Sequence, residues 1–163
     1  MGCLGVLFAL ADKQSKKILS IKNDEELVEY IENDIEENWD DEFTCETDKA
    51  WDAIHRCFAD GKLELLGGIA PLNSIIFGGT ILNTESDYYV SYKDKRLVSE
   101  IAKHIQTIDK DKLKIMYDGI QLDYQGAKNS EDFEYTWSNF EDIIQFYICA
   151  AKAKRNVIFT VDQ

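Results

Sequence analysis

The feature that most constrains the fold is an aromatic stripe in the last third of the chain. Large side chains recur there at alternating spacings of four and three residues, which places them on one face of a helix: Phe133, Trp137, Phe140, Ile144, Tyr147 and Ala151. Ser130 stands where the N-cap of this helix is expected, and the basic residues between Lys152 and Arg155 complement its negative end. A stripe this regular predicts a core-facing helix and not a ligand site.

Other segments show shorter patterns of helix and strand. Apolar and β-branched runs predict strands at residues 5–11, 87–92 and 156–162. Helical periodicity predicts further helices at about residues 13–19, 23–39, 48–60, 94–108 and 109–117. Residues 63–79 contain two Gly-Gly pairs and a proline, which predicts a buried, turning connection. Because no repeat or linker divides the sequence, we predict one domain over residues 1–163.

Negative charge is concentrated in one segment. The chain has 31 acidic and 18 basic residues, which gives a net charge of −13. Between Asn23 and Asp48 there are 13 acidic residues and no basic one, so the rest of the chain is balanced at 18 acids and 18 bases. This composition argues against a nucleic-acid-binding protein, whose affinity depends on cationic contacts.

The helix predicted at residues 23–39 has two unlike faces. Its apolar stripe, which includes Leu27 and Ile35, is expected to face the core. A ridge of carboxylates follows the opposite side: Glu25, Glu29, Glu32 and Glu36. The residues that follow extend the charge and add aromatic side chains: Glu37, Trp39, Asp40, Asp41, Glu42 and Phe43. We predict a docking surface for a basic protein here, with Trp39 and Phe43 as anchors; the alternative is a solvated face that only confers solubility.

The stretch DKAWDAIHRCFADG, residues 48–61, raises the question of catalysis. On a helix, residues two apart do not face each other, so a dyad of Cys57 and His55 is excluded and Cys57 is expected in the core. His55 lies at the edge of the buried arc with Asp52 three residues before it, which is the arrangement of an oriented general base. The same pair fits a helix salt bridge or a histidine bonded to a neighbouring element. We favour a structural role and keep Asp52 and His55 as alternative catalytic residues.

Other site chemistries find no support in the sequence. Four scattered cysteines (Cys3, Cys45, Cys57 and Cys149) and two histidines give no zinc spacing, and they predict the reduced thiols of a cytoplasmic protein. The acidic run lacks the order of a calcium loop, and the Gly-Gly pairs match no phosphate-binding motif. The apolar N-terminal run is too short to span a membrane and lacks the basic residues that precede a signal sequence. We therefore predict no metal, no cofactor and no membrane association.

Several short motifs occur together in a recognisable order. These are MGCLG, DKAWDAIH, IIFGG, YYVSY followed by VSEIA, FYICAAKAK and the closing NVIFTVD. By this ordered set the chain resembles the YfbM-like family of small bacterial proteins, a domain of unknown function. It departs from the family where Lys93-Asp94 and Tyr124-Gln125 replace the usual prolines. The resemblance implies a compact α+β fold with several amphipathic helices on a small mixed or antiparallel sheet that includes the N- and C-terminal strands, but no activity, cofactor or catalytic residue.

These observations lead to a ranked set of functional hypotheses. The first is a non-enzymatic, acidic protein-binding module of the bacterial cytosol. The resemblance also implies a genetic setting near toxin genes, which suggests an immunity protein that neutralises a cognate basic toxin. The alternative is an uncharacterised enzyme or small-ligand-binding protein with a pocket near Asp52, His55 and the Gly-Gly segment at residues 67–79. A third is a plain self-associating protein.

Overall fold

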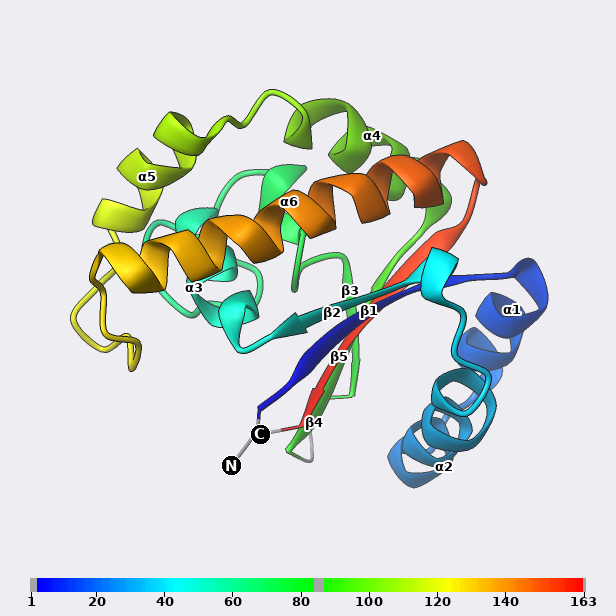
Figure 1. Cartoon of the computed structure of the whole chain (residues 1–163). Coiled ribbons are helices and arrows are strands. Elements are labelled where there is room, and N and C mark those ends of the chain that lie inside the picture. The colour runs from blue at the N-terminus through cyan, green and yellow to red at the C-terminus, as the bar shows by residue number, and fades with distance from the viewer. Residues whose placement is uncertain (1–2, 84–86, 163) are drawn as a thin grey trace.

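The fold is built on a five-stranded antiparallel sheet, seen here in a computed structural model that describes residues 3–83 and 87–162 (Figure 1). The strands are β1 (Gly5–Leu10), β2 (Thr44–Asp48), β3 (Thr80–Asn83), β4 (Tyr88–Lys93) and β5 (Asn156–Asp162), in the spatial order β2-β1-β5-β4-β3. The two terminal strands, β1 and β5, pair antiparallel along six residues at the centre of the sheet. This arrangement confirms the predicted α+β fold with both terminal strands in one sheet.

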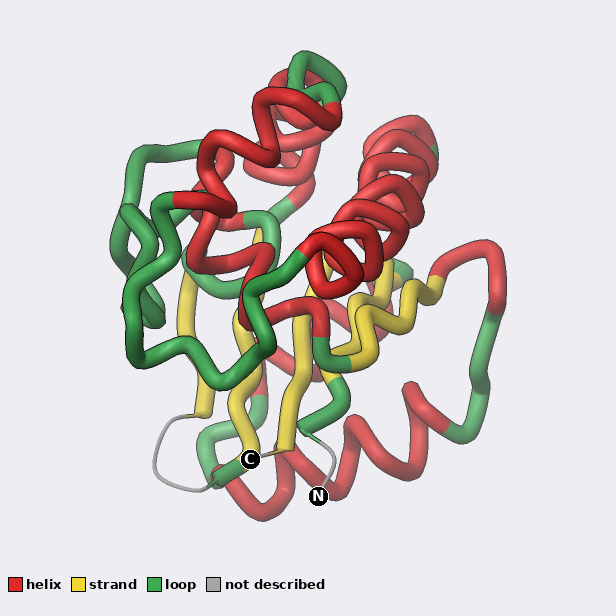
Figure 2. Tube along the Cα trace, turned by 60° about the vertical axis from the view of Figure 1, so that its left-hand side comes forward, coloured by secondary structure: helices red, strands yellow, loops and turns green. Residues whose placement is uncertain are grey.

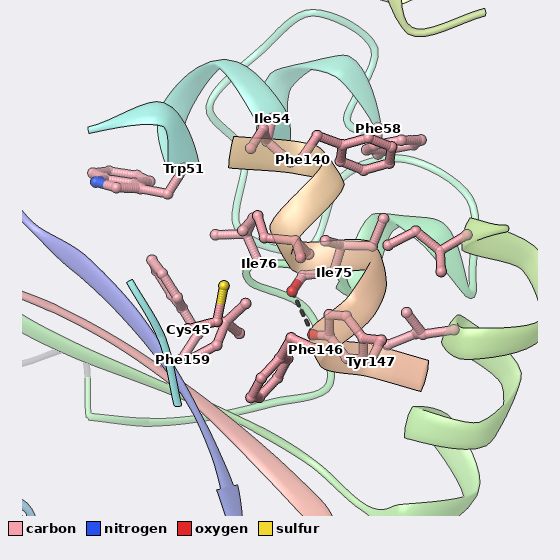
Figure 3. Close-up of a cluster of buried hydrophobic side chains, with 14 of the residues drawn as sticks. Cys45, Trp51, Ile54, Phe58, Ile75, Ile76, Phe140, Phe146, Tyr147 and Phe159 are labelled. Carbon is pink, nitrogen blue, oxygen red and sulfur yellow. Dashed lines mark hydrogen bonds between the residues drawn. The ribbon is translucent and has the colours of Figure 1, made fainter. Parts of the chain in front are cut away.

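Four helices cover one face of the sheet. They are α3 (Ala50–Cys57), α4 (Lys95–Ile105), α5 (Lys110–Asp118) and α6 (Ser130–Lys152). The predicted aromatic stripe of α6 faces the core, with Phe133, Phe140 and Tyr147 buried. The other three residues of the stripe are only half-buried against the same core: Trp137, Ile144 and Ala151. The Tyr147 hydroxyl donates a hydrogen bond to the Ile75 carbonyl oxygen, which satisfies the one polar atom of this fully buried side chain (Figure 3).

A smaller helical layer covers the opposite face. It consists of α1 (Asp12–Ser20), α2 (Asp24–Tyr30) and a π-helical continuation, η1 (Ile31–Glu36). Strand β1 serves both layers, because Leu7 faces the α3–α6 side whereas Phe8 contacts the α1–α2 side. Figure 2 shows helices on both sides of the sheet. Within the predicted apolar stripe of α2 and η1, Leu27, Ile31 and Ile35 are buried as expected, whereas Val28 is half-buried. Asn23 caps α2 through a hydrogen bond from the Glu26 amide.

The structure corrects the prediction for the segment between η1 and α3. The sequence predicts no strand at residues 44–48 and starts a helix at residue 48, but these residues form β2, an edge strand that pairs with β1. The alternation that marks a strand is present, since Cys45 and Thr47 are buried and Glu46 is exposed. It escaped detection because the inward residues are small and not strongly apolar. Helix α3 begins only at Ala50, after Asp48 adopts a positive φ of 47°.

Two smaller corrections concern a cap and a turn. The N-cap of α6 is Asn129 and not Ser130, because the Asn129 side chain accepts the bond from the Asp132 amide. The Gly78-Gly79 pair turns the chain into the unpredicted edge strand β3, with φ values of 80° and 58°. A Cβ atom at Gly79 would lie 2.3 Å from the Tyr92 carbonyl oxygen, so this close approach explains the glycine.

Candidate functional site

His55 is part of the protein interior. Its side chain is 1% exposed, and its ring packs edge-on against Phe77 with the ring centroids 5.2 Å apart. Nε2 lies 2.6 Å from the Glu64 carbonyl oxygen, which can only accept, so Nε2 carries the proton. This hydrogen bond ties α3 to the segment that follows it, which is the structural role favoured for His55 above.

The electrostatic environment keeps His55 neutral. The pKa of the imidazole is lowered to about 4, chiefly by burial and also by the nearby charge of Arg56, while the hydrogen bond to Glu64 acts in the opposite direction. Within the described part of the chain, Nδ1 is buried and has no hydrogen-bond partner. Protonation would place a second N–H in this apolar surrounding, so the charged form is strongly disfavoured.

Asp52 does not pair with His55, which corrects the sequence interpretation. Its carboxylate lies 2.5 Å from Nε of Arg56, one helical turn further along α3. Arg56 also binds Asp123 at 2.9 Å and lies over the Tyr124 ring at 5.7 Å. A permanently charged guanidinium at i+4 is a stronger partner for a carboxylate than a buried, neutral imidazole. Cys57 is buried in the core, as the helical geometry predicted.

A cavity of about 640 Å³ lies beside Asp52. Aromatic and carboxylate side chains line it, among them Trp51, Tyr124 and Asp132. Within the described residues its lining includes neither His55 nor any part of the Gly-Gly segment at residues 67–79. The residues grouped together by the alternative hypothesis are therefore divided: Asp52 borders a cavity, whereas His55 faces the core.

A second buried base, which the sequence did not reveal, lies in the same layer as His55. Lys93 ends β4 and is fully buried; its Nζ donates to the Ile76 carbonyl oxygen and lies 5.8 Å from the Phe159 ring centroid. Burial lowers the pKa of Lys93 well below its usual value. The strand alternation carries a signal for this position, since Tyr89, Ser91 and Lys93 point to the same face of β4.

The acidic ridge on α2 and η1 is largely exposed to solvent. The side chains of Glu25, Glu29 and Glu32 are exposed, as is Glu37 beyond η1. Glu36 departs from the prediction, because it is half-buried and accepts a hydrogen bond from the Tyr88 hydroxyl at 3.2 Å. Burial raises the pKa of Glu36. The π-helical pairing of η1 changes the angular spacing from that of an α-helix, which rotates this residue out of the ridge toward the sheet.

The two aromatic residues expected as partner anchors make contacts with other residues of this chain. Trp39 is 42% exposed; its ring meets Phe8 edge-on at 5.8 Å and its Nε1 donates to Asp41 at 2.7 Å. The Arg155 guanidinium lies over the Phe43 ring, with its Cζ atom 3.5 Å from the ring centroid. These contacts fasten the 3₁₀ turn η2 (Asp41–Phe43), which the Asp40 carboxylate caps. The turn is thereby preorganised beside the sheet.

An acidic cleft lies between this turn, strand β2 and helix α6. Its volume is about 450 Å³, and four carboxylates line it: Asp41, Glu42, Glu46 and Asp142. The cleft also contains the buried Cys45, whose thiol pKa is raised to about 12 by burial and by the charges of Asp142 and Glu46. In Figure 1 the chain runs from α2 along the side of the sheet into β2, beside α6.

Asp142 is the contribution to the acidic cleft that the sequence interpretation missed. It lies nearly 100 residues after Glu46, so neighbourhood in sequence gives no indication of the contact. A signal was present on α6, where Asp142, Gln145 and Cys149 recur at helical spacing beside the aromatic stripe. The Cys149 thiol fixes this side of the cleft by donating to the Glu42 carbonyl oxygen at 3.6 Å.

Among residues 3–83 and 87–162, no group of three or more His, Cys, Asp or Glu side chains is placed to hold a metal ion. The four cysteines are free thiols. Over the same residues, no helix combines the length and the apolar character that crossing a bilayer demands.

Comparison with known proteins agrees with this architecture. Residues 1–160 match the family described as a domain of unknown function, DUF1877. The chain belongs to this family. Its fold is similar to that of YfbM from Escherichia coli, whose crystal structure is that of a protein of unknown function. The TM-score is 0.69 at 13% sequence identity, over 97% of this chain and 99% of YfbM. No curated protein matches the chain.

Proposed function

We propose that this protein is a non-enzymatic binding module for a basic protein partner, which docks on the acidic ridge and the acidic cleft. The observation that carries the proposal is the cleft itself, where Asp142 of α6 joins three carboxylates of the acidic segment around one concave surface. Carboxylates gathered in a concave site focus the electrostatic field, which speeds encounter with a basic surface and disfavours acidic partners.

The position of the cleft at the sheet edge supports this proposal. Strand β2 is the last strand of the sheet, so one side of its backbone has no strand partner in the described part of the chain. An unpaired strand edge can hydrogen-bond an extended segment of another protein. The exposed side chain of Glu46 on β2 would then meet a basic residue of that segment. We therefore infer that the partner offers an extended, basic segment.

The biological role that we assign to such a module is that of an immunity protein. It would remain in the bacterial cytoplasm and cover the basic surface of a cognate toxin domain. Two features support this role. One is the net charge of −13, and the other is that the whole excess of acidic over basic residues lies within residues 23–48. Neutralisation by a tightly bound, charge-complementary partner requires no catalytic group on the protein.

Charge reversal at the cleft provides the test of this proposal. Affinity capture from the source cells with the wild-type protein should yield a basic partner. The variant Asp41→Lys/Asp142→Lys should bind that purified partner at least tenfold more weakly, chiefly through slower association, with a weaker dependence on salt. The measurement is surface plasmon resonance at several salt concentrations.

A matched variant separates the location of the charge from its amount. Glu100→Lys/Asp111→Lys makes the same change in net charge at exposed positions of α4 and α5 that do not line the cleft. It should retain nearly wild-type affinity. Equal binding by wild type and the Asp41→Lys/Asp142→Lys variant would show that the cleft is not the docking surface.

A further inference from the structure

The cavity beside Asp52 has a composition different from that of the acidic cleft. Its volume of about 640 Å³ lies within the range of small-molecule sites, about 300–1,000 Å³. It shares no lining residue with the cleft, so its function is independent of the proposed protein partner. We propose that this cavity binds a small organic cation with an ammonium or guanidinium group.

Aromatic rings form the walls of the cavity and are held in place by hydrogen bonds. The Trp51 indole donates to the Cys3 carbonyl oxygen at 2.8 Å, and the Tyr124 hydroxyl donates to Asp132 at 3.0 Å. The Tyr135 hydroxyl accepts from the Lys49 amide at 3.0 Å. Fixed aromatic faces attract organic cations and require little ordering when the ligand enters.

Carboxylates outnumber cationic side chains in the lining of the cavity. Of its three carboxylates, Asp52 pairs with Arg56, but no salt bridge within residues 3–83 and 87–162 involves Asp48 or Asp132. Asp132 is half-buried and accepts hydrogen bonds from two tyrosine hydroxyls, of Tyr117 and Tyr124. A carboxylate removed from water without a cation gains from a charged ligand. Lys49 also lines the cavity, but its side chain is exposed.

Two residues of the cavity wall, Asp52 and Tyr124, already bind a guanidinium group that lies behind the wall. Arg56 lies 5.7 Å from the Tyr124 ring centroid while its Nε contacts the Asp52 carboxylate at 2.5 Å. An aromatic ring combined with a carboxylate thus binds a guanidinium within the chain itself. Tyr135 and Asp48 repeat this combination at the cavity without an arginine, which is where the cationic group of the ligand is expected.

NMR titration of the tryptophan indole signals tests the proposal directly. The probe is cadaverine, a diamine with two ammonium groups, and its neutral analogue is pentanediol. The Trp51 indole signal should shift in a saturable manner with cadaverine and not with pentanediol. The Trp39 indole signal, which reports on the acidic surface, should shift only slightly and without saturation. A shift confined to Trp39, or the same Trp51 shift with both compounds, would overturn the proposal.

Two variants and one control test whether cadaverine binds in the cavity. Asp132→Asn should weaken cadaverine binding by about tenfold or more, because a charge-assisted contact is lost. Glu131→Gln removes the same charge from the same turn of α6 outside the cavity lining and should bind as the wild type does. Leu63→Phe, which fills the cavity without changing its charge, should abolish the Trp51 shift. Unchanged binding in Leu63→Phe contradicts the proposal even where Asp132→Asn fails to fold, and thermal unfolding establishes which variants are folded.

Discussion

Ionisable side chains occupy two opposite environments in this protein. In the interior, His55 and Lys93 are removed from water and packed among aromatic rings, so burial lowers the pKa of both bases. On the surface, the ridge of α2 and η1 holds Glu25, Glu29 and Glu32 in full contact with solvent. Titratable side chains should therefore affect different properties of the protein in the two regions.

The difference separates stability from association. A buried base couples folding to pH, because the unfolded chain binds a proton that the folded chain rejects. An exposed carboxylate changes folding little, since water and salt screen it in both states. Its effect appears instead in the long-range field that an approaching protein meets. Substitutions in the two regions should therefore change different measurements.

The largest effect is expected at Lys93. The unfolded chain carries this lysine protonated below its ordinary pKa of about 10.4, whereas the buried folded form resists protonation. Its stabilising contribution is therefore lost as pH falls from that value, by about 1.4 kcal/mol for each pH unit while the folded group stays neutral. Relative to Lys93→Met, the wild type should lose unfolding free energy between pH 9 and pH 7 in urea unfolding, by up to about 3 kcal/mol.

The control for this prediction is an exposed lysine two residues further along. Lys95 lies on the surface near Asp12, at 3.3 Å, so Lys95→Met should reproduce the wild-type dependence of unfolding free energy on pH. Comparing variants with the wild type at each pH cancels the contribution of the buried tyrosines. A difference between wild type and Lys93→Met that stays constant from pH 7 to pH 9 would mean that Lys93 is charged in the folded protein.

A smaller effect of the same sign is expected at His55. Its pKa is about 4 when folded, against about 6.5 when unfolded, so the stability it confers is complete above pH 6.5 and is lost as pH falls toward 4. Between pH 7 and pH 5 the wild type should lose about 2 kcal/mol relative to His55→Gln, whose side-chain amide can still donate to Glu64. Urea unfolding at each pH measures this difference.

The histidine of α4 provides the comparison for His55. His104 is half-buried on α4, with Nδ1 2.9 Å from the Glu100 carbonyl oxygen, and His104→Gln is the matched histidine substitution outside the core, measured in the same way. If His55→Gln and His104→Gln behave alike, the imidazole of His55 is not buried in its neutral form in solution.

Much of the fold could be predicted from the sequence, because strong periodicity leaves few alternatives. The stripe of α6 and the apolar runs of β1, β4 and β5 show in the sequence which residues are buried. Burial of these residues is also what determines where the helix and the strands form. Strands β2 and β3 were missed because they are edge strands with small or half-exposed inward residues. Such strands are selected by pairing with their neighbours, which a single segment does not reveal.

The site was predictable only where it lies within one segment. The ridge carboxylates Glu25 and Glu29 follow from helix geometry alone. The acidic cleft needs Asp142, and the partner of Asp52 turned out to be Arg56 and not His55. These outcomes depend on packing between distant elements and on competition between partners. Lys93 shows the limit clearly, since a strand-ending lysine normally predicts a solvent-exposed position.

The smallest effect on stability is expected on the ridge itself. Glu29 lies one helical turn from Glu25 and three residues from Glu32, so Glu29→Gln relieves repulsion and should stabilise the protein by at most about 0.5 kcal/mol at low salt. The gain should largely vanish in 1 M salt, where the Debye length is about 3 Å. Glu134→Gln, which removes a carboxylate 2.7 Å from Lys110, should have the opposite sign at low salt. A loss of stability in Glu29→Gln would show that the ridge is held by contacts within the chain, and that its carboxylates are not free to meet a partner.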